Sequence, residues 1–240
     1  MQEATQAEGS ERNGSPGTVI VTGGASGLGA AVVRGVVDAG GTPVVFDVQP
    51  PPSEVDHAVV DVSDASAVRD AVEDVVERHG RLDAAVTAAG IDAPGELSDV
   101  PAERWEKVIG VNLLGTAAVA RAALPHLERA SGRFVSVAST LGLRAVSDAT
   151  AYCASKFGVV GFTRALAAET SGRVGVTLVL PGGMNTAFFD TRDDRYKPPP
   201  DLQLNRPEHV ASAILFALSQ PAGCEIRELV IAPSTETSWP

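Results

Sequence analysis

The sequence predicts an α/β fold in three layers, with a doubly wound parallel sheet of about seven strands between two layers of helices. Two observations predict it. Short, valine-rich apolar runs alternate along the chain with longer stretches of helical periodicity, a pattern typical of parallel sheets. The 240 residues are enough for one such domain and its buried core. Hydrophobic residues make up 44% of the chain and aromatic residues only 5%, so we expect a core of Val, Ala and Leu.

The composition excludes several classes of function. Thirty acidic residues outnumber nineteen basic ones, with no run of Lys or Arg, which argues against binding to nucleic acid or an anionic membrane. The longest apolar helical stretch, residues 211–218, is too short to span a bilayer. The two cysteines and four histidines form no ligand cluster, so we expect no metal site and a reducing, cytoplasmic environment. Residues 1–16 are polar and Gly/Ser-rich, which predicts a disordered tail before a single domain over residues 17–240.

A run of glycines lies between the first strand and the first helix. Residues 18–21 read as a buried strand, TGGASGLG follows over residues 22–29, and residues 30–37 have helical character. Here glycines let the backbone approach a pyrophosphate, and the helix N-terminus offers free N–H groups and positive potential. A simple tight turn is the alternative, but the flanking strand and helix favour a dinucleotide phosphate site.

A carboxylate ends the second strand. Residues 43–46 form this strand and Asp47 closes it, about 20 residues past the glycines, where a carboxylate accepts both ribose hydroxyls of an adenosine and repels a 2′-phosphate. NAD is therefore the expected cofactor. An ordinary strand-end cap is the alternative role of Asp47.

The remaining elements follow in order. Three prolines between Asp47 and Asp61 leave room only for an extended crossover, which leads to a third strand over residues 59–62. The segment 184–206 is irregular, proline-rich and charged, and we expect a lid over the site. The other expected helices are 63–80, 101–127, 149–170 and 207–219, and the other strands 82–88, 133–138, 174–180 and 228–231.

Tyr152 and Lys156 carry the predicted chemistry. Their spacing places both side chains on one face of a helix, one turn apart. A phenol with a pKa of ~10 holds its proton too tightly to act as a base at neutral pH, and a fixed ammonium nearby favours the phenolate. The pair suits proton transfer at an alcohol oxygen while a hydride moves at the carbon, although a solvated helix face is the alternative.

Two further polar residues stand out. Ser139 follows a strand at the carboxyl edge of the sheet, where ligands bind in open α/β folds. Asn112 is an amide inside an apolar helix, so it needs a hydrogen-bond network, and a kink or a water site is the rival explanation.

Together these motifs resemble the short-chain dehydrogenase/reductase family, in its compact single-domain branch. The resemblance covers about residues 17–232 and rests on separated motifs in register. These are the glycine loop, Asp61-Val62, Pro181-Gly182 with Thr186, and the tetrad of Asn112, Ser139, Tyr152 and Lys156. It implies a Rossmann-type sheet and an NAD-dependent oxidoreductase that moves a hydride between nicotinamide and a secondary alcohol or ketone.

The resemblance also implies roles. Tyr152 would be the general acid/base and Ser139 would hydrogen-bond the substrate oxygen. Lys156 would bind the nicotinamide ribose and lower the tyrosine pKa, and Asn112 would position a water in a proton relay. Thr87-Ala88 departs from the family's asparagine-rich turn, and the crossover after Asp47 is short. The implied cofactor-binding residues are Gly23, Ser26, Gly27, Leu28, Gly29, Asp47, Val48, Asp61, Val62, Ala88, Ala89, Gly90, Tyr152, Lys156, Pro181, Gly182, Met184 and Thr186.

Two other functions stay open: an epimerase or dehydratase with the same Tyr–Lys pair, and a non-catalytic dinucleotide-binding regulator. Helices 101–127 and 149–170 carry extra apolar residues, and their family equivalents form a four-helix contact between subunits, so we expect a homodimer or homotetramer. The expected substrate is a small-molecule alcohol or ketone, such as a mid-sized secondary alcohol, a cyclic diol or a hydroxyacyl compound. Its candidate pocket residues are Leu141, Leu143, Arg144, Val146, Phe188, Phe189 and Tyr196.

Overall fold

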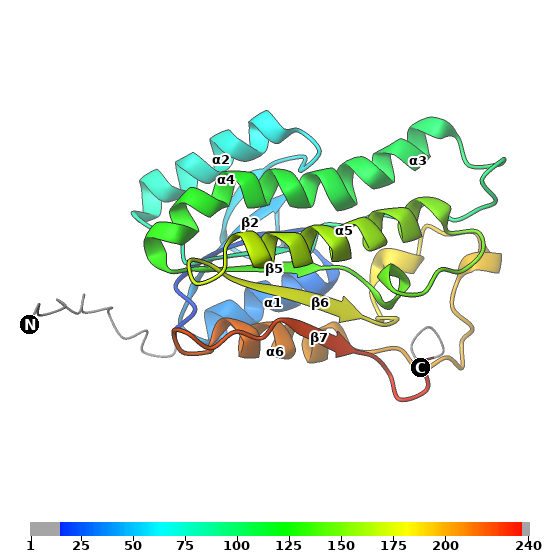
Figure 1. The fold of residues 1–240 in the computed structure, drawn as a ribbon. Helices are drawn as coiled ribbons and strands as arrows, with labels where there is room; N and C mark the ends of the chain where they lie inside the picture. Colours follow the sequence, from blue (N-terminus) through cyan, green and yellow to red (C-terminus); the bar gives the residue numbers. More distant parts are fainter. Residues whose placement is uncertain (1–14, 237–240) are drawn as a thin grey trace, which may run out of the picture.

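Seven parallel strands form the centre of the fold, in the order β3-β2-β1-β4-β5-β6-β7 (Figure 1). The computed structural model describes residues 15–236. The chain builds outward from β1 to β3, then crosses back and continues from β4 on the other side of β1. This switch point places a crevice at the carboxyl ends of β1 and β4, where ligands bind in such sheets. The strands are β1 (Thr18–Thr22), β2 (Thr42–Asp47), β3 (Asp56–Val59), β4 (Ala84–Thr87), β5 (Arg133–Val137), β6 (Gly175–Pro181) and β7 (Glu228–Ile231).

Helices cover both faces of the sheet and complete the three predicted layers (Figure 1). On one face lie α2 (Ala65–His79), α3 (Ala102–Ile109), α4 (Gly115–Ala130) and α5 (Thr150–Glu169). On the other face α1 (Gly27–Asp38) packs against α6 (Pro207–Leu218). Asp64 caps α2 by accepting hydrogen bonds from the backbone N–H groups of Ser66 and Ala67, which satisfies free donors of the first turn.

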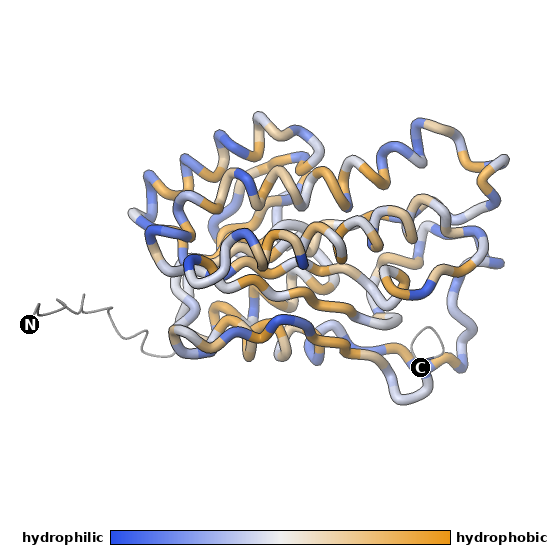
Figure 2. Tube along the Cα trace, viewed as in Figure 1, coloured by the Kyte–Doolittle hydropathy of each residue, from blue (hydrophilic) through white to orange (hydrophobic). Residues whose placement is uncertain are grey.

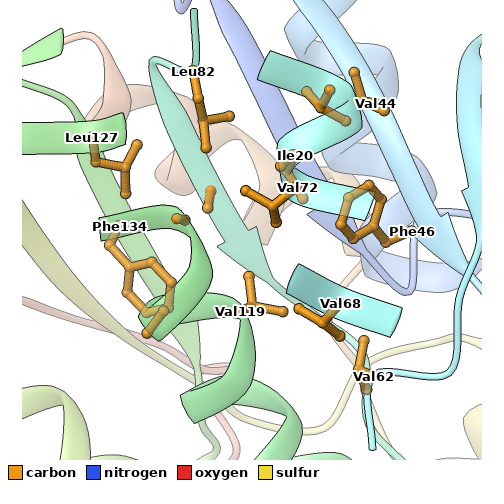
Figure 3. Packing of buried hydrophobic residues seen from close by; sticks show 14 of the residues in the cluster. Ile20, Val44, Phe46, Val62, Val68, Val72, Leu82, Val119, Leu127 and Phe134 are labelled. Carbon is orange, nitrogen blue, oxygen red and sulfur yellow. The ribbon is translucent and has the colours of Figure 1, made fainter. Parts of the chain in front are cut away.

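Each face has its own core, built mainly from valine, alanine and leucine as the composition predicts. Along the chain, apolar segments coincide with the strands and the inner faces of the helices (Figure 2). Between the sheet and α2 and α4, buried valines of the helices pack against strand residues (Figure 3). The labelled members are Ile20, Val44, Phe46, Val62, Val68, Val72, Leu82, Val119, Leu127 and Phe134.

The third strand lies earlier than predicted. The sequence predicted residues 59–62, but β3 is Asp56–Val59, paired with β2 from Val44↔Asp56 to Asp47↔Val59. Val60 and Val62 are buried for another reason, because they belong to the core formed with α2 and α4. The crossover is accordingly shorter than expected, with only residues 48–55 between the two strands, and it is extended as the prolines require.

The predicted helix 101–127 is one continuous helical stretch over Ala102–Ala130. Its middle, Gly110–Leu114, is a π-helical turn. By length and composition this stretch is apolar enough to cross a membrane, so the expectation that residues 211–218 are the longest apolar helical stretch is wrong. In this fold its inner face packs into the core through Val119, Ala123 and Leu127.

The start of the fold lies slightly earlier than predicted. Ser15 donates a hydrogen bond to the backbone oxygen of Gly40, and Pro16 is buried, so residues 15 and 16 are packed against the domain rather than part of a tail. The predicted tail otherwise lies outside the described residues.

Candidate active site

A cavity of about 700 Å³ opens at the carboxyl ends of the strands, at the switch point of the sheet. Its wall includes Gly23 after β1, Asp47 at the end of β2, Ser139 after β5 and Gly182 after β6. All of the residues proposed to bind the cofactor line this one cavity except Pro181, which ends β6. Residues far apart in the sequence thus meet at the place where the topology predicts a ligand.

The glycine loop is too tightly packed to hold larger residues. A Cβ on Gly29 would lie 2.1 Å from the backbone oxygen of Gly23, and one on Gly23 would lie 2.8 Å from Cα of Ala89. Gly23 and Gly27 also have positive φ values of 69° and 51°. The side chain of Ser26 makes no capping hydrogen bond, and the first turn of α1 has no acidic residue. The open helix end beside a bare backbone therefore fits the pyrophosphate of a dinucleotide.

Asp47 points from the end of β2 towards the glycine loop. Its Oδ2 accepts a hydrogen bond of 3.0 Å from the backbone N–H of Ala25, and its Oδ1 accepts one of 3.1 Å from Gln49. The carboxylate is half-buried on the cavity wall. Asp61, on the same wall, accepts hydrogen bonds from the backbone N–H and the hydroxyl of Ser63, which lower its pKa. Both acids therefore border the part of the cavity next to the phosphate loop.

Tyr152, Ser139 and Lys156 come together at the other part of the cavity. The Ser139 hydroxyl lies beside the phenol of Tyr152 and lowers its pKa. Lys156 is 5% exposed, and its Nζ donates to the backbone oxygen of Val137 at 2.9 Å and lies 5.6 Å from the centre of the Tyr152 ring. One helix, α5, holds the phenol and the ammonium, and the strand end after β5 holds the serine.

Burial moves the pKa values of Tyr152 and Lys156 in opposite directions. Loss of solvent raises the pKa of Tyr152 to about 12, against a smaller lowering by the Ser139 hydrogen bond. Burial lowers the pKa of Lys156 to about 8. For Tyr152 the loss of solvent outweighs the lowering by Ser139, and Lys156 is not among the main causes of the shift, so the lowering of the tyrosine pKa by Lys156 stays a prediction.

Asn112 lies behind the cavity wall rather than on it, with 1% of its surface exposed. Its Oδ1 accepts a hydrogen bond of 2.9 Å from the backbone N–H of Ile91, and its Nδ2 donates to the oxygen of Ile91 and to Oγ of Ser155, both at 3.0 Å. Ser155 in turn donates to the backbone oxygen of Tyr152 at 2.8 Å. Asn112 thus has the predicted hydrogen-bond network, and it lies within the π-helical turn Gly110–Leu114. Its role in a proton relay stays a prediction.

The segment 184–206 forms one side of the cavity. Its ends are joined by hydrogen bonds between Asn185 and Asn205 and between Asn205 and Gly183. Of the candidate pocket residues, Leu141, Phe188, Phe189 and Tyr196 line the cavity, whereas Leu143, Arg144 and Val146 do not. Leu143 instead packs on the core of β6 and α5, and Arg144 and Val146 point to solvent.

The sequence analysis missed an ion pair at this side of the cavity. Nη2 of Arg192 lies 2.6 Å from Oδ2 of Asp92, and both side chains are largely buried. Arg192 lines the cavity and Asp92 lies behind it. The two residues are separated by 100 positions and belong to irregular segments, so no local pattern indicated their contact.

Known proteins share this arrangement. Residues 17–197 match the family described as short chain dehydrogenase. A 3-oxoacyl-[acyl-carrier-protein] reductase of Thermotoga maritima is 32% identical over 219 residues, 83% of this chain and 89% of the relative. An L-fucose dehydrogenase of Mus musculus is 31% identical over 242 residues, 92% of this chain and 89% of the relative.

A solved structure shares the fold. The alcohol dehydrogenase from the archaeon Thermococcus sibiricus, complexed with 5-hydroxy-NADP, has a TM-score of 0.80 and 24% identity, over 90% of this chain and 95% of that one. The family match and the two relatives cover most of the chain, and the fold and the cavity agree with them. The chain therefore belongs to the short-chain dehydrogenase/reductase family and is a dinucleotide-dependent oxidoreductase that acts on alcohol or ketone groups.

Proposed function

We propose that this protein transfers a hydride between NAD(H) and a secondary alcohol or ketone, with Tyr152 as the general acid/base. The observation that carries the proposal is that Tyr152, Ser139 and Lys156 line the same cavity as the glycine loop and Asp47. A proton-transferring group and a dinucleotide site thus share one space, as hydride transfer at a carbinol carbon requires.

Each residue has a distinct task. When bound, the nicotinamide supplies or accepts the hydride. The hydroxyls of Ser139 and Tyr152 would both bind the substrate oxygen, and Tyr152 would give its proton to that oxygen in reduction or take it in oxidation. Lys156 would hold positive charge beside the phenol and bind the ribose next to the nicotinamide. Gly90 lies next to Lys156, since a Cβ there would be 3.7 Å from its Nζ.

NAD rather than NADP is the proposed cofactor. Asp47 lies on the cavity wall at the end of β2, where a carboxylate would accept the ribose hydroxyls and repel a 2′-phosphate. Ser26 in the glycine loop and Val48 after β2 also line the cavity and offer no positive charge to a phosphate there. The acidic net charge of −11 acts in the same direction.

Assembly and location belong to the same proposal. Leu114 and Phe157 are 58% and 44% exposed on the α4–α5 side, and burial against a second copy would remove this apolar surface from water. We therefore expect a homodimer or homotetramer, which light scattering at micromolar concentration measures.

The state of the cysteines bears on the proposed location. Cys153 and Cys224 are both free thiols, which suits a reducing cytoplasm.

A cofactor-coupled assay tests the function. The purified protein is mixed with NAD⁺ or NADH and a panel of secondary alcohols and ketones, and the absorbance of reduced nicotinamide is followed, with Tyr152→Phe as the control. Turnover that needs the Tyr152 hydroxyl is the expected result. Tight NADH binding without turnover of any panel member would favour a non-catalytic regulator instead.

A further inference from the structure

The side of the cavity that the segment 184–206 forms carries basic side chains, although the chain as a whole is acidic. The segment 184–204 contributes three charged side chains to the cavity wall, and they are Arg192, Arg195 and Lys197. Its acidic residues are absent from that wall: Asp190, Asp193, Asp194 and Asp201. Lys197 is paired with Asp194 at 2.8 Å, and Arg195 lies 4.0 Å from Asp193. Arg192 is the least exposed of the three cations, with 16% of its side chain exposed against 67% for Arg195 and 40% for Lys197.

Arg192 is held in place from several sides. Its Nη2 contacts Asp92 at 2.6 Å, and its Nη1 donates to the backbone oxygen of Tyr196 at 3.3 Å. Its guanidinium lies 5.1 Å from the ring of Phe188 and 4.5 Å from that of Phe189. Only 16% of the side chain is exposed. A long side chain with this many contacts has little rotamer freedom left to lose when a ligand binds.

The fixed guanidinium still has unused donors. An arginine has five N–H groups, and Asp92 and Tyr196 engage two of them. Asp92 contacts it through Oδ2 alone, because Oδ1 accepts a hydrogen bond from the backbone N–H of Ala93 at 2.7 Å. Nε of Arg192 is buried and has no hydrogen-bond partner among residues 15–236. The pair therefore lacks the parallel two-bond geometry that Arg and carboxylate groups favour.

Arg192 is also close to the reacting end of the cavity. The ring of Phe188 lies 5.8 Å from that of Tyr152 and 5.1 Å from the guanidinium of Arg192, so one phenyl ring spans the distance between them. Tyr152, Phe188 and Arg192 line the same cavity. A substrate whose oxygen reaches Tyr152 therefore has its other end within reach of the guanidinium.

We propose that Arg192, held by Asp92, binds a carboxylate of the substrate, so that the preferred substrates are hydroxy acids and the matching keto acids. The inference rests on the proposed function, since it concerns the substrate of the same site. Nη1 and Nη2 of Arg192 each keep one N–H that Tyr196 and Asp92 do not use, and these two groups can donate to the carboxylate oxygens. A neutral alcohol offers these N–H groups no charged acceptor, and hydrogen bonds to a charged acceptor are the stronger ones.

The alternative is that the ion pair only fastens the segment 184–206 to the loop after β4. The two roles of Arg192 differ in which substrates they affect. A fastener affects every substrate alike, because it changes the shape of the cavity. A binding site for carboxylate affects acids far more than neutral compounds of the same size.

Matched substrates separate the two roles. Pyruvate, acetoacetate and levulinate place the carboxylate at increasing distance from the ketone, and their methyl esters remove the charge. We measure kcat/KM with NADH for each acid and its ester in the wild type, Arg192→Gln and Arg192→Lys. Arg69→Gln, on the exposed face of α2, makes the same change in net charge away from the cavity and is the matched control.

The expected result is that the wild type prefers at least one acid over its ester, and that Arg192→Gln lowers this preference by about 10- to 100-fold. Arg192→Lys should keep part of it, because charge remains without the two N–H groups of the guanidinium, and Arg69→Gln should keep all of it. An equal loss for acids and esters, or a wild type without acid preference, would overturn the inference and leave the proposed function intact.

Binding is measured separately from turnover. Calorimetry with each of the three acids and the NADH-loaded protein should show binding by the wild type and a loss in Arg192→Gln. If no ketone is reduced but binding depends on Arg192, the carboxylate site at Arg192 is confirmed and the proposed function fails. If Arg192→Gln does not fold because Asp92 is left buried without a cation, the double variant with Asp92→Asn removes that charge and is compared instead.

Discussion

Replacing Asn112 with leucine tests how the candidate site is held together. The Asn112 amide connects two segments that border the cavity, because it bonds both backbone groups of Ile91 and the Ser155 hydroxyl next to Tyr152. Leucine has a similar size but no hydrogen-bonding group. In Asn112→Leu the N–H and C=O of Ile91 therefore lose their partner, while Ser155 still donates to the oxygen of Tyr152.

The expected loss follows from these contacts. A fully buried polar group without a partner costs about 1–3 kcal/mol. The two backbone groups of Ile91 are only partly buried and Ile91 lines the cavity, so water can replace part of the lost bonding. We therefore expect the free energy of unfolding to fall by about 2–3 kcal/mol. Thr116→Val is the control on the same helix, since Oγ1 of Thr116 makes one hydrogen bond of 2.8 Å to the oxygen of Asn112. Its loss should be about 1 kcal/mol.

Urea unfolding followed by circular dichroism measures both variants. A loss in Asn112→Leu no greater than that in Thr116→Val would refute the reasoning, because it would mean that water or backbone movement replaces the amide. A normal stability with lost activity would instead favour the water-positioning role that family resemblance implies for Asn112.

Three further predictions concern the reacting groups and the cofactor. Tyr152→Phe should lower kcat by at least about 100-fold and leave the Kd of NADH almost unchanged, and full activity would contradict the acid/base role. Asp47→Ser should raise the ratio of NADP to NAD in kcat/KM by about tenfold or more, and an unchanged ratio would mean that Asp47 does not face the ribose. Burial lowers the pKa of Lys156 from 10.5 to about 8, so the unfolded chain binds more protons between these values. The wild-type free energy of unfolding should therefore rise through this pH window, and denaturant titrations should show less of the rise in Lys156→Met.

Local patterns predicted most of the fold, and the largest miss has a physical cause. The helices and the order of the elements follow from apolar periodicity and from caps such as Asp64. The third strand was misplaced because Val59, Val60 and Val62 form an apolar run, whereas the ladder joins β2 to residues 56–59. Pairing uses backbone groups, which side-chain pattern does not encode. Val60 and Val62 are apolar because the core under α2 needs them.

Sequence patterns also predicted some parts of the candidate site and missed others. Motifs with a fixed spacing, such as the glycine loop and Tyr152 with Lys156, could be found because one turn or one helix positions their members. The contact of Asp92 with Arg192 depends on how two irregular segments meet in space, so nothing in either segment indicates it. Motifs whose members belong to one turn or one helix could thus be found from the sequence, and a contact between two irregular segments could not.

The pKa of Tyr152 predicts different pH profiles for the two directions of the reaction. Burial raises this pKa to about 12, so at neutral pH the phenol carries the proton that ketone reduction needs. Oxidation needs the phenolate, and a pKa about five units above neutral pH corresponds to about 7 kcal/mol for ionisation before a cofactor or substrate binds. We therefore expect kcat/KM for alcohol oxidation to rise between about pH 6 and pH 9, while kcat/KM for reduction does not rise. Steady-state rates in both directions, in buffers of constant ionic strength, measure the two profiles. An oxidation profile that is already flat at about pH 6 would contradict this reasoning, because the phenol would then have to lose about six pKa units in the working complex. The Ser139 hydrogen bond and the charge of Arg192 lower the pKa of Tyr152, but burial outweighs them in this structure.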